Sequence, residues 1–496
     1  MTRASSRRRL GTGAWAIAFV ALAAASTVRA SDFSDDLKAR RTRMMERLGP
    51  DAMLVLWSAA PQRYSNDIDY ESRQDSNLYY LTGMTQDDTI LVLMPGNAAK
   101  REILFVKDRN PAREHWTGHR LTPEEAKALT GVDTVLAFSQ FDAFVAAVLD
   151  GRGFGPIDDK EAPRFFEALK AARARVHLAL DPARGVNDPL TPPLEFARRI
   201  RERFFGFQIA NATPLLTDLR LVKTPYERQV LLRGFEISNE AQRAGMLAAR
   251  PGAYEYEVKA AIEAVFRARG AVSWSYPSIV GSGPNATILH YPDGGRRMQA
   301  GELLLVDAAC NYEYMSGDIT RTYPVGGAYS AAEKDIYRIV LRAQEEAIQA
   351  AKAGATLEAV HNKTVDVVKA GLVELGLITD TTGNQYRMWY THGASHYIGI
   401  DVHDVGDNKR PLVPGMAFTI EPGIYIRRSV LDALPRTPEN DALIAKIRPA
   451  VERYADIGVR VEDSFLLEES GLRRLSAGVP RTIEEIEAFL KPKGSR

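Results

Sequence analysis

The chain has 496 residues, of which 45% are hydrophobic and 26% are charged. A globular chain of this length buries a large core and is expected to divide into two domains. Its 64 basic and 63 acidic residues nearly cancel, so the protein lacks the basic surplus that binds nucleic acid.

The first 30 residues predict a cleaved export signal. Arginines at positions 7–9 precede an apolar run at 14–25, and a small-x-small site ends at Ala30, just before Ser31. The run is shorter than the roughly 20 apolar residues that span a membrane, so we expect cleavage and no stable membrane anchor. The general secretory and twin-arginine routes both remain open. Removal deletes five basic and no acidic residues, which changes the net charge from +1 to −4.

Residues 31–217 are predicted to form an N-terminal α/β domain. Short apolar strands are expected at 52–56 and 89–94, and helices at 141–149 and 163–173. We expect a linker over 211–221.

Residues 218–496 are predicted to form a second domain, in which long helices surround apolar strands. Thr224 and Pro225 supply an N-cap and a first-turn proline for a helix at 225–250, and further helices are expected at 254–269 and 331–353. Cys310 is the only cysteine in the chain, so no intramolecular disulfide can form.

Two strands of this second domain end in a carboxylate. Asp307 follows the apolar run 303–306, and Glu421 follows the run 417–420. A buried carboxylate without a partner costs several kcal/mol, so it is normally paired or bound to a metal. The segment from Asp307 to Asp318 is predicted to be a hairpin with a polar turn at 311–317. Two carboxylates side by side in such a hairpin repel unless a cation lies between them.

Histidines cluster farther along the chain. His392, His396 and His403 are three of the eight histidines, and the glycines and apolar residues between them argue against a histidine-rich surface loop. The spacing differs from HExxH, which rejects a helical zinc site of that type. Taken singly, each of these residues has an ordinary structural explanation. The set of Asp307, Asp318, His396, Glu421 and Glu462 predicts a site for two divalent ions and the water between them.

These residues lie in the stretches LLLVDAACNYEYMSGDITRTYPV, HGASHYIGIDVHD, FTIEPGIYI and IGVRVEDS. They resemble the Xaa-Pro aminopeptidases (aminopeptidase P) of the creatinase, prolidase and methionine aminopeptidase superfamily. The resemblance extends from about Phe33 to about Leu472. The resemblance implies an α/β (α+β) protein, in which an N-terminal creatinase-like domain is followed by a pita-bread catalytic domain.

The resemblance also implies roles for individual residues. Asp307 would chelate one ion, Asp318 and Glu462 would bridge both, and His396 with Glu421 would hold the other. The remaining active-site residues would be His290, His392 and His403, supported by Tyr425 and Arg460. Four carboxylates neutralise two divalent ions, and an oxygen-rich set without thiolate favours manganese, with zinc and cobalt left open.

The implied reaction is hydrolysis of the N-terminal Xaa-Pro bond of a peptide by a hydroxide that bridges the ions. Glu421 would carry the proton of the water to the proline nitrogen. His290 and His403 would donate to the oxyanion, each donor being worth roughly 3 to 4 kcal/mol. His392 would line the pocket for the proline ring. A prolidase, which shares the five ligands, and a non-catalytic binding protein remain alternatives.

Four features bear on the partners and the location of the enzyme. The stretch 64–83 resembles the family's N-terminal domain, and the resemblance implies a dimer or tetramer. Trp116 either approaches the active site of a neighbouring subunit or packs in the core.

Segment 427–456, longer than in compact relatives, either covers the cleft or is a surface insertion. Asn285 is a glycosylation triplet close to His290, where a glycan would block the site, which favours export to a bacterial periplasm.

Overall fold

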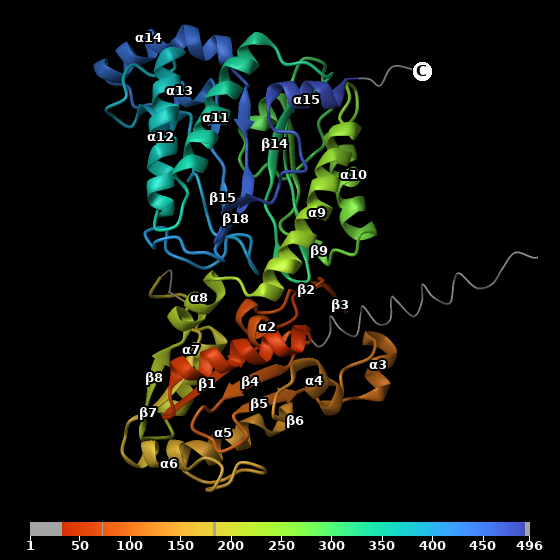
Figure 1. Ribbon diagram of the computed structural model, residues 1–496, viewed down its shortest axis with the longest axis vertical. Helices are drawn as coiled ribbons and strands as arrows, with labels where there is room; N and C mark the ends of the chain where they lie inside the picture. The colour runs from red at the N-terminus through yellow and green to blue at the C-terminus, as the bar shows by residue number, and fades with distance from the viewer. Residues whose placement is uncertain (1–31, 72, 182–184, 492–496) are drawn as a thin grey trace, which may run out of the picture. The chain divides into compact units, whose positions relative to one another are not determined.

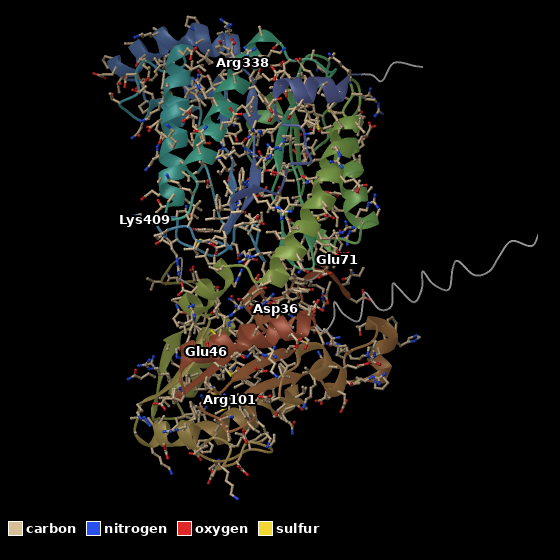
Figure 2. All side chains as sticks on the ribbon, viewed as in Figure 1. Asp36, Glu46, Glu71, Arg101, Arg338 and Lys409 are labelled. Atoms are coloured by element: carbon tan, nitrogen blue, oxygen red, sulfur yellow. The ribbon has the colours of Figure 1, made fainter. Side chains whose placement is uncertain are left out.

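The computed structural model describes residues 32–71, 73–181 and 185–491, and the predicted export signal at 1–30 lies outside them. The chain divides into two compact units, one ending at Leu219 and the other beginning at Arg220 (Figure 1). Among the described residues, no helix is long and apolar enough to cross a membrane. Charged side chains such as Glu46, Arg101, Arg338 and Lys409 lie exposed on the two units (Figure 2).

The N-terminal unit is built on a mixed sheet with the strand order β6-β5-β4-β1-β7-β8. Its strands are β1 Ala52–Trp57, β4 Thr89–Leu93, β5 Glu102–Val106, β6 Thr134–Ala137, β7 Ala174–Leu178 and β8 Phe207–Asn211. A separate exposed hairpin is formed by β2 Arg63–Ser65 and β3 Ile68–Asp69. β1 pairs antiparallel with β4 and parallel with β7, so the strands expected at 52–56 and 89–94 are neighbours.

The helices at 141–149, 163–170 and 192–201 pack against this sheet through buried apolar residues. A helix covers residues 32–48, and the others are α2 Ser76–Thr82, α3 Pro111–Thr117, α4 Pro123–Thr130, α5 Phe141–Leu149, α6 Pro163–Lys170, α7 Pro192–Arg201 and α8 Thr213–Leu221. Phe144 of α5 packs against Phe105 of β5 with ring centroids 5.2 Å apart, and both rings are fully buried. The sheet and its helices therefore share a core of their own.

Two features of the N-terminal part refine the expectations. The boundary between the two units falls inside the linker predicted at 211–221, and most of that segment is helical, because the Asn211 side chain accepts a hydrogen bond from the Thr213 amide at 2.9 Å and α8 begins there. Trp116 does not pack in the core, because it lies on α3 and is 85% exposed.

The C-terminal unit contains short antiparallel sheets. The strands are β9 Ser273–Trp274, β10 Ile279–Ser282, β11 Leu303–Asp307, β12 Cys310–Tyr312, β13 Met315–Ser316, β14 Thr320–Pro324, β15 Ala417–Ile420, β16 Gly423–Tyr425, β17 Gly458–Arg460, β18 Asp463–Glu468 and β19 Gly471–Arg474. The helices are α9 Pro225–Ala248, α10 Glu255–Ala268, α11 Ala331–Ala350, α12 Leu357–Glu374, α13 Ser429–Asp432, α14 Pro438–Tyr454 and α15 Ile483–Leu490. Short 3-10 helices are η2 Gly283–Thr287 and η3 Gln385–Met388 in this unit, and η1 Phe138–Gln140 in the N-terminal unit.

The strands of this unit lie between the helix pair α9 and α10 and the helix pair α11 and α12 (Figure 1). Thr224 caps α9 as predicted, with a capping box completed by Glu227 and a proline in the first turn. Predicted helices at 225–250, 254–269 and 331–353 correspond to α9, α10 and α11, each ending one to three residues earlier.

Segment 427–456 contains α13 and α14. Ile444, Ile447 and Val451 of α14 are buried in the main core of the unit. Asp335 of α11 accepts hydrogen bonds from Arg453 and Tyr454, each at 3.0 Å. The cavities lined by His290, Asp307 or His392 include no residue of this segment, which favours the surface-insertion interpretation.

Candidate metal centre

Asp307 ends β11, which lies between two partners in a fully buried sheet. Its Cα pairs with Ile279 of β10 on one side and with Thr320 of β14 on the other. Asp318 comes two residues before β14, so the predicted return strand begins later than expected. The predicted turn at 311–317 is also wrong in detail. It folds into its own small hairpin, β12 and β13, because Glu313 and Tyr314 adopt left-handed backbone angles.

A second set of strands carries the other carboxylates. Glu421 directly follows β15, and Glu462 lies between β17 and β18, whose first residue, Asp463, pairs with Ile420. The His396 loop runs beside β15, since the Thr419 amide donates to the His396 carbonyl at 2.9 Å and the Glu421 amide to the Ala394 carbonyl at 2.8 Å.

Two buried glutamines hold these strand pairs in matching ways. The Gln242 amide nitrogen, on α9, donates to the carbonyls of Ala308 and Ile319 at 2.8 and 2.9 Å. The Gln344 amide nitrogen, on α11, donates to the carbonyls of Ile420 and Val461 at 3.0 and 3.1 Å. Each glutamine thus fixes the backbone beside two carboxylates, and the two halves of the unit repeat one arrangement.

The five predicted donors converge on one place. Donor atoms of Asp307, Asp318 and Glu462 lie within 4.8 Å of one another, and so do those of His396, Glu421 and Glu462. His396 Nε2 is 3.4 Å from an oxygen of Asp318 and 3.4 Å from an oxygen of Glu421. Glu462 belongs to both groups, which places it between two possible cation positions.

The carboxylates are crowded and buried. Burial and the neighbouring charge of Asp307 raise the pKa of Asp318 well above its usual range. Burial and the charge of Asp318 do the same to the pKa of Glu462, and burial also raises the pKa of Glu421. Such a group is stable in its charged form only with cations among the oxygens, so the donor set fits a pair of divalent ions.

A chain of hydrogen bonds leads away from Asp307. Arg460 Nη2 donates to Asp307 at 2.5 Å, and Arg460 Nη1 donates to the Tyr425 hydroxyl at 2.9 Å. That hydroxyl lies 2.8 Å from His392 Nε2, while His392 Nδ1 is 2.8 Å from the Gly393 carbonyl. Burial and the charge of Arg460 lower the pKa of His392 to about 3, so the ring is neutral. Its Nε2 therefore accepts a hydrogen bond from the Tyr425 hydroxyl.

Two hydroxyl groups at the cluster were missed by the sequence analysis. The Tyr276 hydroxyl contacts both Asp307 and Asp318, the latter at 2.5 Å. Thr320 Oγ1 donates to Glu462 at 2.7 Å and accepts from Arg460 Nε at 2.9 Å. Only the pairing of Asp307 with Thr320 could have indicated that the threonine lies at the cluster. That pairing depends on a strand register that the sequence does not specify.

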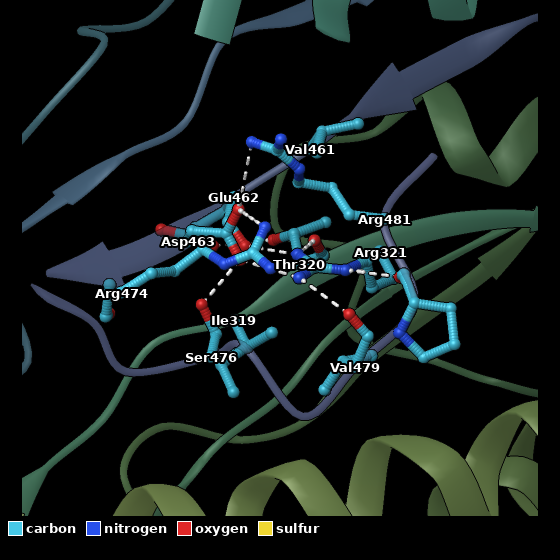
Figure 3. A network of polar contacts seen from close by, with 12 residues as sticks. Ile319, Thr320, Arg321, Val461, Glu462, Asp463, Arg474, Ser476, Val479 and Arg481 are labelled. Atoms are coloured by element: carbon cyan, nitrogen blue, oxygen red, sulfur yellow. Dashed lines mark hydrogen bonds and ion pairs between the residues drawn. The ribbon is translucent and has the colours of Figure 1, made fainter. Parts of the chain in front are cut away.

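Behind Glu462 lies a fully buried ion pair (Figure 3). Arg321 Nη2 donates to Asp463 at 2.6 Å, and Arg321 Nη1 donates to the Glu462 carbonyl at 2.6 Å. Ser476 also donates to Asp463, at 2.5 Å. Burial would raise the pKa of Asp463, but the charges of Arg321 and Arg474 outweigh it and lower that pKa. The backbone around Glu462 is therefore fixed by a charged network of Arg321 and Asp463, which are not among the five predicted metal ligands.

The loop after His396 is fixed by another buried network. Asp404 is paired with Arg220 at 2.5 Å and with Lys223 at 2.7 Å. Gly399 lies against this pair, where any side chain would clash with Asp404 and Lys223. His403, next to Asp404, thereby lies with its ring centroid 4.3 Å from that of His396.

A cavity of about 340 Å³ opens on the cluster. Asp307, Asp318, His396, Glu421 and Glu462 all line it, together with His290, His392, His403 and Arg460. A neighbouring cavity of about 330 Å³ shares four of these residues, His290, His403, Asp307 and Asp318, and has apolar walls at Pro277, Ile279, Pro292 and Val402. The structure thus brings together all the predicted site residues of the C-terminal unit, including Tyr425, whose hydroxyl contacts His392. Trp116 belongs to the N-terminal unit.

Comparison with known families and proteins gives matches across nearly the whole chain. Residues 231–469 match the model of metallopeptidase family M24, and residues 37–154 match that of the aminopeptidase P N-terminal domain. The Xaa-Pro aminopeptidase of Haemophilus influenzae is 34% identical over 466 residues, covering 92% of this chain and 97% of the relative. Human Xaa-Pro aminopeptidase 3 is 30% identical, covering 88% of this chain and 81% of the relative.

Solved structures agree with the sequence relatives. Aminopeptidase PepP of Pseudomonas aeruginosa superposes with a TM-score of 0.76 at 32% identity, covering 92% of this chain and 98% of that chain. The same coverage and TM-score hold for Escherichia coli aminopeptidase P with the inhibitor Pro-Leu, also at 32% identity. An aminopeptidase P N-terminal domain is followed along the sequence by a pita-bread catalytic unit, and this chain belongs to metallopeptidase family M24.

Proposed function

We propose that the protein is an Xaa-Pro aminopeptidase, a metal-dependent exopeptidase that removes the N-terminal residue from peptides with proline second. The observation that carries the proposal is the convergence of four carboxylates and His396 on one cavity wall. The Xaa-Pro aminopeptidases of Haemophilus influenzae and Escherichia coli, each 34% identical to this chain, support the substrate class.

The ligand assignment gives each donor a place. Asp307 would hold one ion, His396 and Glu421 would hold the other, and Asp318 and Glu462 would contribute to both. The membership of Glu462 in both groups of converging donors supports its bridging role. Manganese is the proposed ion because the donors are mainly oxygen.

Divalent ions held there would supply a water of lowered pKa and would polarise the scissile carbonyl. The remaining steps belong to the side chains. Glu421 would accept the proton of the attacking water and deliver it to the proline nitrogen. His290 and His403, which line the cavity, donate hydrogen bonds to the developing oxyanion. Neutral His392, fixed by Tyr425, forms part of the peptide-binding wall.

The test is release of the N-terminal residue from Xaa-Pro-Yaa by the purified protein, with chelator and after adding manganese back. We expect cleavage that depends on metal, and none by Asp307→Asn, which loses a chelating charge. Hydrolysis of Xaa-Pro dipeptides alone would instead identify a prolidase. An inactive protein that binds metal would contradict both.

We also propose an oligomer and an exported enzyme. The exposure of Trp116 on α3 supports a place for it beside a second subunit, in a dimer or tetramer. The proposed mature enzyme begins near Ser31 in the periplasm, and mass spectrometry of the protein from its native host tests this. An intact Met1 would contradict cleavage.

A further inference from the structure

A third cavity, of about 440 Å³, adjoins the 340 Å³ cavity at the cluster. His392 and Gly393 line both, so the two spaces meet there. The other lining residues are His361, Tyr386, Arg387, Tyr390 and Thr391. Because a water molecule occupies about 30 Å³ in the liquid, this space holds an amino-acid side chain together with several waters.

The nitrogens in this cavity are arranged to donate. The Ala394 amide donates to His361 Nδ1 at 3.2 Å, so a neutral His361 ring carries its hydrogen on Nε2 and donates from there. Burial and the charge of Arg387 lower the pKa of His361, which keeps the ring neutral. Arg387 adds a guanidinium with several N–H donors.

No acidic side chain occurs among the described residues that line the cavity. The exposed Arg387 guanidinium lies 5.8 Å from the centre of the Tyr386 ring, and no carboxylate of the described chain pairs with it. The Tyr390 hydroxyl is buried and has no hydrogen-bond partner among the described residues. The cavity therefore offers donors and positive charge directly beside a cluster of carboxylates that attracts cations.

We propose that this cavity is a subsite for a carboxylate of the peptide substrate, with Arg387 as its charged partner and a determinant of specificity. This inference rests on the proposed function. The carboxylate can come from an acidic side chain of the peptide or from the C-terminus of a short peptide, which offer the same chemistry to Arg387.

Three peptides separate these sources. Glu-Pro-Gly amide carries only a side-chain carboxylate, Gln-Pro-Gly free acid carries only a terminal carboxylate, and Gln-Pro-Gly amide carries neither. We expect one acidic peptide to have a higher kcat/KM than the neutral peptide. Arg387→Gln should lower that ratio about tenfold, the effect of losing one charge-assisted hydrogen bond, mainly through KM.

Two further variants strengthen the test. Arg387→Lys should restore part of the preference, and Arg387→Glu should reverse it in favour of Lys-Pro-Gly amide. The matched control is Arg338→Gln, an exposed arginine on α11 outside the cavity (Figure 2), which should leave every ratio unchanged.

The outcomes distinguish this inference from the proposed function. If the neutral peptide is cleaved and Arg387→Gln leaves both acidic-to-neutral ratios unchanged, the subsite is wrong and the aminopeptidase stands. An equal loss of activity on all three peptides would also overturn it, because that result indicates a structural role for Arg387. If the metal-loaded protein cleaves none of the peptides, the proposed function itself fails.

Discussion

At the scale of single residues, His396 and His403 pose the sharpest question. Both lie beside Asp318, and donor atoms of all three fall within 4.8 Å of one another. Distance alone therefore allows His403 to be a ligand. The proposed roles differ: His396 holds an ion, whereas His403 donates to the oxyanion.

Alanine variants separate the two roles. His403→Ala should keep both ions and nearly unchanged substrate affinity, while kcat falls roughly a hundredfold or more, the loss expected for one transition-state donor. His396→Ala should lose an ion as well as activity. Elemental analysis and steady-state kinetics check both variants. A metal-depleted His403 variant beside a fully loaded His396 variant would reverse the assignment.

His177 predicts a pH effect in the N-terminal unit. It lies buried on β7, and neither ring nitrogen has a hydrogen-bond partner among the described residues. Burial and then the charge of Arg175 lower its pKa below the usual 6.5. Below about pH 6.5 the unfolded chain therefore binds a proton that the folded chain does not, and stability falls as pH falls toward the lower folded pKa.

Replacing His177 should remove that contribution. Urea unfolding at pH 7.5 and 5.5 should show a smaller loss of stability for His177→Leu than for the wild type. The matched control is His115→Leu, since His115 lies exposed on the same unit. Equal pH slopes for the wild type and His177→Leu would contradict the prediction.

How far single residues can be predicted depends on what surrounds them. Asp307 and Glu421 could be predicted because each stands at the end of an apolar run, where a buried charge is costly unless it is paired or bound to a metal. Tyr276 gave no such signal, because a tyrosine in a polar stretch is ordinary. Its role exists only once the fold brings its hydroxyl to Asp307 and Asp318.

At the scale of elements, helices were easier to predict than connections. The capping box at Thr224 and the proline after it fixed the start of α9. The same kind of signal at Asn211 and Thr213-Pro214 begins α8, so the segment expected to link the two domains is itself mostly helical. The hairpin of β12 and β13 was missed because its turn uses two non-glycine residues with positive φ.

The paired glutamines give a prediction about elements. Because Gln242 and Gln344 fix the backbone beside different carboxylates, each supports the metal site from one helix. Gln344→Leu and Gln242→Leu should each weaken manganese binding about 10- to 100-fold, as loss of an outer-shell partner does, and lower the melting temperature.

A matched control lies on the same helix. Gln349 is exposed on α11, so Gln349→Leu should change neither quantity. Calorimetric titration with manganese and thermal unfolding measure both effects. Wild-type affinity in both buried variants would show that the glutamines serve folding alone.

At the scale of the whole molecule, each unit has a core of its own. The N-terminal core gathers on the mixed sheet, whereas the C-terminal core lies among α9 to α12, α14 and the strands that carry the site. All five proposed ligands belong to the C-terminal unit. Metal binding is therefore coupled directly to the folding of that unit.

Removing metal should accordingly act on one unit. At a free metal concentration of about 100 times Kd, binding contributes about 2.7 kcal/mol, which corresponds to a shift of about 5–11 °C for a unit of this size. Differential scanning calorimetry with and without chelator should show the C-terminal transition moving down by that amount. The N-terminal transition, identified by its sensitivity to His177→Leu, should stay in place. Asp307→Asn should make the C-terminal transition insensitive to chelator. A shift in the N-terminal transition alone would contradict the placement of the metals.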